Sequence, residues 1–204
     1  LKSTFTVDYK NFTAVPPLPT LANSAATGSG GFETSLDGWK GGGKFDAILQ
    51  RDTGSAASGY ASLKLTCPSN AAAFTAWVRQ DSFDASAYPY LEFDYRVPPQ
   101  LRVDLLLKVN GQDYCIGFTD HTPGYTRLGQ IADVKADLQW HHASVPLLQM
   151  LQKALPTAGQ YQVNSLAFGD SGWLGNAEGF TYWLDNFHLV PAVNGNDFKT
   201  DVQL

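Results

Sequence analysis

The sequence is poor in charged residues and in methionine: charged residues make up 16% of its 204 residues, and methionine occurs once. An ordinary globular domain carries about a quarter charged residues. Aromatic residues, in contrast, reach 13%, and there are 19 glycines and 11 prolines. This composition is typical of short strands joined by many turns, and it argues against a coiled coil, a helical bundle or a disordered chain.

Other absences exclude whole classes of function. No apolar run approaches the roughly 18 residues that a membrane-spanning helix needs, so no membrane span is expected. The net charge is -5 and the 14 basic residues are scattered, which argues against the concentrated positive surface that nucleic acids require. The two cysteines, Cys67 and Cys115, form no CxxC pair and no cluster with histidine, so a zinc site is not expected. Their state stays open between one disulfide and two buried free thiols.

The chain divides into three parts. Residues 1–31 begin with a partly alternating strand pattern and continue, from residue 14, as a linker rich in proline, glycine and serine. Residues 32–191 carry strand signals at short spacing and form the main domain, and residues 192–204 are a C-terminal tail. The linker favours an origin in a longer polypeptide, so tethered domains are expected as partners.

The main domain has mostly strand character. The predicted strands are Asp46–Arg51, Ala61–Thr66, Phe74–Asp81, Tyr90–Val97, Arg102–Asn110, Asp113–Thr119, Trp140–Val145, Ser165–Asp170 and Thr181–Val190. Asn110-Gly111 predicts a type I′ hairpin, and one short helix is predicted over 146–154, with a proline at its start. The absence of a βαβ rhythm predicts an all-β fold, an antiparallel β-sandwich (jelly roll) with one short helix.

Strand alternation separates a core face from a second face in three consecutive segments, 74–79, 91–97 and 102–109. If these segments are neighbours, their second face is a shallow polar groove with one indole. Such a groove suits a sugar, because a pyranose stacks its C–H face on an aromatic ring while its hydroxyls take planar hydrogen bonds. The alternative is the ordinary solvated side of an antiparallel sheet. The candidates on this face are Trp77, Arg79, Glu92, Asp94 and Arg96, and those that would close it from loops are Trp39, Tyr125 and Trp173.

Two carboxylates stand in apolar strand contexts, Glu33 in GFET and Asp185 in YWLDNF. Burying an unpaired carboxylate is costly, so each needs a partner. The first and last strands of a sandwich often pair, which would bring both carboxylates beside the loop GSAASGYAS at residues 54–62. There they would be either calcium ligands together with backbone carbonyls, or capping groups that accept N–H bonds from turns.

Three runs, GFETSLDGW, RDTGSAASGYASLKL and YWLDNFHL, lie at residues 31–39, 51–65 and 182–189, and the resemblance that they carry covers about residues 31–191. Together they resemble the calcium-stabilised β-jelly-roll carbohydrate-binding modules with a galactose-binding-like fold. The resemblance implies a structural Ca2+ ion with Glu33 and Asp185 as ligands, backbone oxygens from the loop around Gly59, and Asp52 as a further candidate. It assigns no role to the aromatic candidates, since ligand-binding aromatics vary among members. The tripeptide QWH at 139–141 is also similar to laminin-G-like sandwiches.

We therefore expect a non-catalytic carbohydrate-binding module, secreted or at the cell surface, that targets a larger glycan-active or surface protein to a polysaccharide or oligosaccharide. A structural or adhesion domain for protein contacts is the alternative. A glycan lyase or hydrolase is third: Glu92 with Asp94, or His121 with Tyr125, offer acid–base groups. Neither pair has a diagnostic spacing, so no catalytic residue is assigned.

Overall fold

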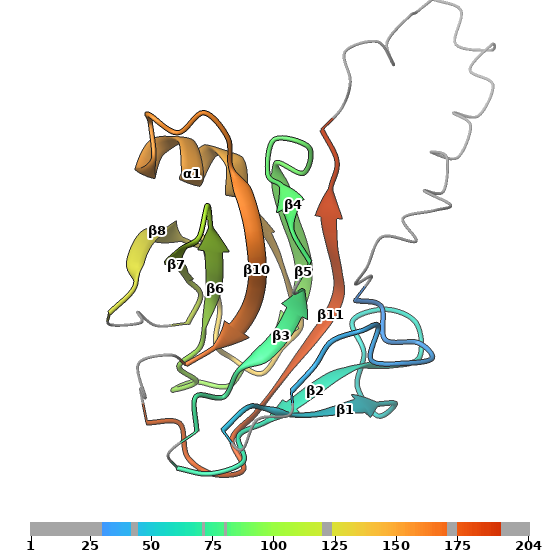
Figure 1. The fold of residues 1–204 in the computed structure, drawn as a ribbon. Helices are drawn as coiled ribbons and strands as arrows, with labels where there is room; N and C mark the ends of the chain where they lie inside the picture. Colours follow the sequence, from blue (N-terminus) through green and yellow to red (C-terminus); the bar gives the residue numbers. More distant parts are fainter. Residues whose placement is uncertain are drawn as a thin grey trace, which may run out of the picture.

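Two β-sheets packed face to face form the described part of the chain, with one short helix beside them (Figure 1). The computed structural model describes residues 30–41, 45–70, 72–79, 81–119, 124–170 and 175–192, the side chain of Arg79 excepted. Nearly all of the predicted N-terminal strand, linker and C-terminal tail lies outside these residues. The sandwich with one short helix that the sequence predicts is confirmed.

The first sheet has five strands and is antiparallel throughout. In spatial order its strands are β1 (Ile48–Asp52), β2 (Ser62–Thr66), β11 (Thr181–Val190), β5 (Tyr90–Arg96) and β9 (His141–Val145). The bounds of β11 agree with those predicted, and the other four strands are a few residues shorter or shifted. Because β11 is central, the last strand of the described residues pairs with two strands from the first half of the sequence, β2 and β5.

The second sheet has six strands. In spatial order they are β3 (Ala76–Arg79), β10 (Gln162–Gly169), β6 (Asp104–Val109), β7 (Gln112–Gly117) and β8 (Thr126–Gln130), and β4 (Phe83–Asp84) also pairs with β10. The β7–β8 pair is parallel, which departs from the purely antiparallel sandwich predicted. The sequence does not predict β4, which has two residues, or β8, in which Leu128 is the single buried side chain.

The connections follow their local sequence signals. Asn110 and Gly111 both have positive φ, 50° and 82°, and turn β6 into β7 as the type I′ prediction requires. Helix α1 (Leu147–Ala154) begins after Pro146 and buries Leu147 and Leu151. No helix in the described ranges is long and apolar enough to cross a membrane.

The core lies between the sheets and is rich in aromatic rings. Phe93 is at its centre, with ring centroids of Phe118, Phe168 and Phe187 at 5.6, 5.2 and 6.3 Å. Trp39 belongs to the same cluster, since it is 3% exposed and stacks on Phe168 at 5.9 Å. The prediction that Trp39 closes a binding site from a loop is therefore wrong: its indole seals the core instead.

Both cysteines are buried free thiols. Cys67 follows β2 in the first sheet, and Cys115 lies in β7 of the second sheet. This arrangement corresponds to the second of the two states that the sequence leaves open.

Candidate functional site

An apolar floor lies on the outward face of the second sheet. Leu106, Cys115 and Ala167 occupy neighbouring positions on β6, β7 and β10, and their exposed fractions are 9%, 1% and 0%. They face away from the core because they alternate with core residues along their strands. Their burial on an outward face is explained by two partly buried rings, Trp77 and Tyr125, that pack against them.

The two rings come from segments distant in the sequence. Trp77 is on edge strand β3, where it is the register partner of Ala167. Tyr125 directly precedes β8 at the other side of the sheet. Both rings converge on the same floor and remain partly accessible. The structure thus brings together two of the predicted aromatic candidates.

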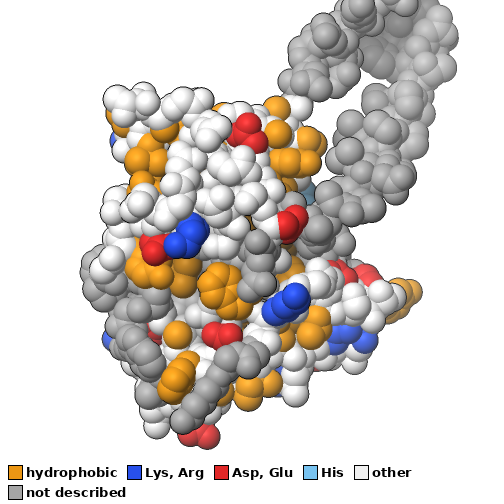
Figure 2. Space-filling view, in the orientation of Figure 1, with side chains coloured by type: hydrophobic (Ala, Val, Ile, Leu, Met, Phe, Trp, Pro, Cys, Tyr) orange, Lys and Arg blue, Asp and Glu red, His pale blue; other side chains and the backbone are white. Residues whose placement is uncertain are grey.

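A groove of about 270 Å³ opens between these rings, and we call it the Trp77 groove. Its lining residues are Ala73, Thr75, Trp77, Leu106, Leu107, Lys108, Asp113, Tyr125 and Ser165. At its rim Lys108 Nζ and Asp113 Oδ1 form an ion pair of 3.1 Å, and both side chains are about half exposed, at 45% and 55%. Figure 2 shows hydrophobic side chains gathered over β6, β10 and β3, with acidic and basic side chains beside them. The groove therefore offers aromatic faces and charged hydrogen-bonding groups to one ligand.

Two other candidates for this surface, Trp173 and Arg79, are not both covered by the described residues. Trp173 lies outside the described residues, and so does the side chain of Arg79, whose backbone belongs to β3.

Three predicted ligand-binding residues lie on the opposite side of the sandwich. Glu92, Asp94 and Arg96 belong to β5 of the first sheet and alternate with buried residues, so they face outward from that sheet. The predicted neighbourhood of the three segments is therefore wrong: β3 and β6 flank β10 in one sheet, while β5 is in the other. Alternation indicates which face a residue takes but not which sheet its strand joins.

The β5 carboxylates already have partners on adjacent strands. Asp94 contacts His142 Nδ1 at 2.8 Å and accepts a hydrogen bond from Asn186 Nδ2 at 2.6 Å. Glu92 lies 3.3 Å from His188 Nε2. These contacts tie β5 to both of its neighbours, β9 and β11.

Trp183 is a further partly exposed indole. It lies on the outward face of the first sheet, with the Arg96 guanidinium 4.8 Å from its ring centroid. Its Nε1 donates to Asp52 Oδ2 at 2.7 Å, and this bond is the main cause that lowers the pKa of Asp52. Period-two alternation with the buried Tyr182 and Leu184 is the signal that places Trp183 outward.

The carboxylate of Asp185 is fully buried and accepts backbone hydrogen bonds. Its Oδ2 accepts from the N–H groups of Ala57 and Ser58 at 2.9 and 3.2 Å, and Oδ1 from that of Asn186 at 2.8 Å. Burial raises the pKa of Asp185, and these bonds oppose the rise. Glu33 acts similarly, since both its carboxylate oxygens accept from the Tyr60 N–H.

Gly59 lies between these two carboxylates and has a φ of 67°. A Cβ at this position would come within 2.6 Å of Glu33 Cδ. The position therefore requires glycine for its backbone conformation and for the close approach.

The four residues predicted to hold calcium do not form an oxygen cage in this arrangement. Backbone N–H groups, not carbonyl oxygens, face Glu33 and Asp185, and the two oxygens of Asp52 accept from Trp183 and from the Gly54 N–H. The Arg51 guanidinium donates to the carbonyls of Phe32 and Glu33, at 2.7 and 2.5 Å. Across the described ranges, no cluster of three or more histidine, cysteine, aspartate or glutamate side chains is arranged to hold a metal. These contacts correspond to capping carboxylates, and calcium stays a prediction.

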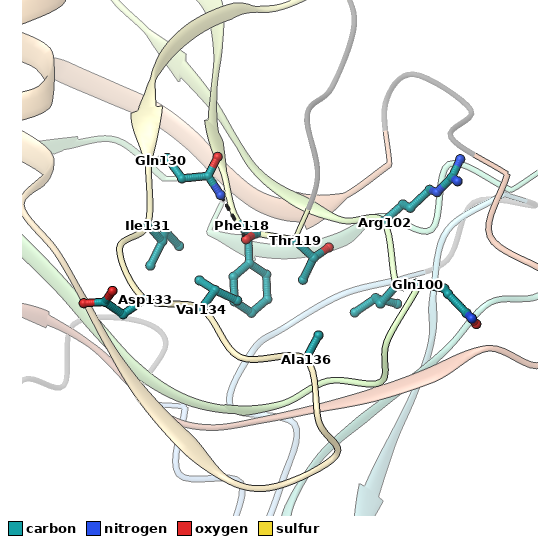
Figure 3. Close-up of a pocket in the computed structure, with 10 residues that line it drawn as sticks. Gln100, Arg102, Phe118, Thr119, Gln130, Ile131, Asp133, Val134 and Ala136 are labelled. Atoms are coloured by element: carbon teal, nitrogen blue, oxygen red, sulfur yellow. Dashed lines mark hydrogen bonds between the residues drawn. The ribbon is translucent and has the colours of Figure 1, made fainter.

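A larger cavity, of about 490 Å³, lies where β6 begins and β7 and β8 end. In Figure 3 Phe118, Val134 and Ala136 line its centre, while the side chains of Gln100 and Arg102 point away from it. The Thr119 hydroxyl, which lines this cavity, already donates to the Val103 carbonyl and accepts from the Val103 N–H. Because Phe118 is only 1% exposed, this cavity offers no open ring face to a sugar.

No family model and no curated protein matches the sequence. Among solved structures, the chain is similar to the family 30 carbohydrate-binding module of a cellulosomal cellulase of Clostridium thermocellum, at 17% identity and a TM-score of 0.47, over 78% of this chain and 90% of that one. It is also similar to a family 22 xylan-binding domain from Paenibacillus barcinonensis, at 19% identity and a TM-score of 0.38, over 82% of this chain and 98% of that one. Both of these structures are carbohydrate-binding modules. At these identities and TM-scores the likeness assigns no ligand to this chain.

Proposed function

We propose that this chain is a non-catalytic carbohydrate-binding module whose ligand lies in the Trp77 groove. The observation that carries the proposal is the convergence of Trp77 and Tyr125 on one apolar floor of an open sheet face. An apolar floor with ring faces at its edges removes water from the C–H face of a pyranose. The Lys108–Asp113 pair at the rim supplies donors and acceptors for hydroxyl groups.

The proposal assigns binding to the groove and no chemistry. Asp113, the carboxylate at its rim, is more than half exposed and paired with Lys108. A catalytic acid for glycoside cleavage needs a pKa raised by its surroundings and a second carboxylate at a fixed separation. A solvated ion pair serves better to hold hydroxyl groups in place.

The biological role that follows is targeting. A module that binds polysaccharide raises the effective concentration of any tethered domain at the same surface. We infer that the chain belongs to a larger protein that is secreted or displayed at the cell surface, where it can reach extracellular polysaccharides. The proline- and glycine-rich segment between residues 14 and 31 would serve as the tether.

Gel electrophoresis in the presence of soluble polysaccharides tests the proposal. Trp77→Ala removes a stacking ring together with its buried area, and it is expected to weaken binding at least tenfold, about 1.4 kcal/mol. Tyr125→Ala is expected to weaken it less, because a phenol ring covers less of the floor. The matched control is Tyr60→Ala, since that ring is 84% exposed in the loop between β1 and β2.

Each alternative function has its own result. If a soluble polysaccharide slowed the migration of Trp77→Ala in the gel as much as that of the wild type, the Trp77 groove would not be the binding site. Absence of any glycan ligand, together with a protein partner bound by the intact chain, would establish an adhesion domain instead. Release of reducing ends from a polysaccharide by the pure protein would establish an enzyme.

A further inference from the structure

The floor of the Trp77 groove belongs to a longer row of side chains that crosses the whole second sheet. Directly paired residues on adjacent strands place their side chains on the same face. In spatial order the members of this row are Lys40, Trp77, Ala167, Leu106, Cys115 and Arg127. The row therefore begins and ends with a cation, on a chain whose net charge is -5.

Arg127 is held in a fixed position at one end of this row. Its Nε donates to the Gly129 carbonyl at 3.2 Å, and its Nη2 donates to Gln130 Oε1. Its guanidinium lies over Gly117, because a Cβ there would come within 3.0 Å of Arg127 Cζ. An arginine has five N–H donors, so the Nη1–Nη2 edge keeps the parallel pair that a carboxylate accepts.

The charges that a ligand meets along this row are positive. Arg127 and Lys40 are exposed, and neither forms a salt bridge with a carboxylate of the described residues. Lys108 is balanced by Asp113. The carboxylates of the adjoining row, Asp46 and Asp104, are partly and fully buried. A ligand along this row would therefore contact an exposed cation at each end, and the Lys108–Asp113 ion pair beside the row adds no net charge.

We propose that the Trp77 groove selects uronate-containing polysaccharides, with Arg127 binding a sugar carboxylate through its Nη1–Nη2 edge. This inference rests on the proposed function of the groove. The two cations are separated by five inter-strand spacings of about 4.8 Å, or roughly 24 Å. A chain along the row therefore places several sugars between Lys40 and Arg127, with the ring faces of Trp77 and Tyr125 between the charges.

The test compares each acidic polymer with its own neutral form. Glucuronoxylan, polygalacturonate and alginate are titrated by calorimetry, each before and after reduction of its carboxylates to alcohols. The wild type is expected to bind at least one polymer ten times more tightly in its acidic form, and this preference should shrink in 0.5 M salt, where the screening length falls to about 4 Å. Arg127→Gln is expected to abolish the preference by weakening the binding of the acidic form.

Two further variants control the interpretation. Gly117→Ala displaces the guanidinium without removing it, and should reduce the preference as Arg127→Gln does. Lys64→Gln makes the same charge change on the first sheet, where Lys64 pairs with Trp183, and should keep the preference. Circular dichroism and melting curves of each variant establish that it is folded.

The outcomes separate this inference from the proposed function. Equal affinity for acidic and reduced polymers, with Trp77→Ala still abolishing binding, overturns the uronate selection and leaves the groove as a neutral-glycan site. A preference that survives Arg127→Gln overturns the role of that residue. Absence of binding to every polymer in both forms overturns the selection, and it overturns the proposed function as well if the neutral polysaccharides of the gel assay also fail to bind.

Discussion

Removing the Asp185 carboxylate should release the loop between β1 and β2 and lower the free energy of unfolding. This buried carboxylate accepts bonds from the N–H groups of Ala57, Ser58 and Asn186 at 2.9, 3.2 and 2.8 Å. Hydrogen bonds to a charged group contribute about 1.5–3 kcal/mol each. Two of the three donors belong to a loop that reaches water once released, so Asp185→Ala is expected to cost about 3–5 kcal/mol in total. Asp185→Asn keeps one carbonyl acceptor and should cost about half as much.

Urea denaturation followed by tryptophan fluorescence measures this loss. The midpoint should fall while the slope stays unchanged, because the area exposed on unfolding is nearly the same. The matched control is Asp113→Ala, in which the carboxylate is 55% exposed and paired with Lys108; an exposed pair contributes at most about 1 kcal/mol. If Asp185→Ala lost no more stability than this control, the carboxylate would not hold the loop and the account of this region would be wrong.

Further predictions concern metal, pH and the core. If Glu33 and Asp185 also hold calcium, as the resemblance implies, EDTA should lower the melting temperature and added calcium should restore it; no response to either would leave these carboxylates as caps for backbone N–H groups. Burial raises the pKa of both the Cys67 and the Cys115 thiol above its ordinary value. The folded protein therefore holds these protons more tightly than the unfolded chain, and its unfolding free energy should fall as pH rises above about 9; a flat profile from pH 8 to 10, or fast reaction of native thiols with a thiol reagent, would contradict this. Trp39→Ala should cost about 3–5 kcal/mol in urea denaturation and leave the glycan affinity of the folded variant intact; a loss below about 1 kcal/mol would show that the indole is not part of the core.

The fold could be predicted from the sequence because its strands alternate strongly. In β5 the buried residues fall at every second position, and the Asn110-Gly111 turn joins β6 to β7. The pairing of strands across the sandwich was not predictable in this way. Alternation placed Glu92 and Trp77 on outward faces correctly, but only the topology shows that these faces look in opposite directions.

The kinds of residue in the candidate site could be predicted from the sequence, but which of the predicted residues lie together in it could not. Trp77 and Tyr125 meet across the second sheet, although β8, which positions Tyr125, has too few buried residues to be recognised. Trp39 has the same glycine-rich loop context as a binding residue, yet its ring is buried among Phe32, Phe168 and Phe187. Arg127 had no sequence signal, because its fixed position depends on the missing side chain of Gly117 on a neighbouring strand.

The indole N–H resonances of the five tryptophans test the central claim most directly. Once each signal has been assigned by single substitution, a bound polysaccharide should shift the Trp77 signal saturably. The signals of Trp39 in the core and of Trp183 on the first sheet should stay in place. A shift of the Trp183 signal with none at Trp77 would place the ligand on the opposite face and contradict the account.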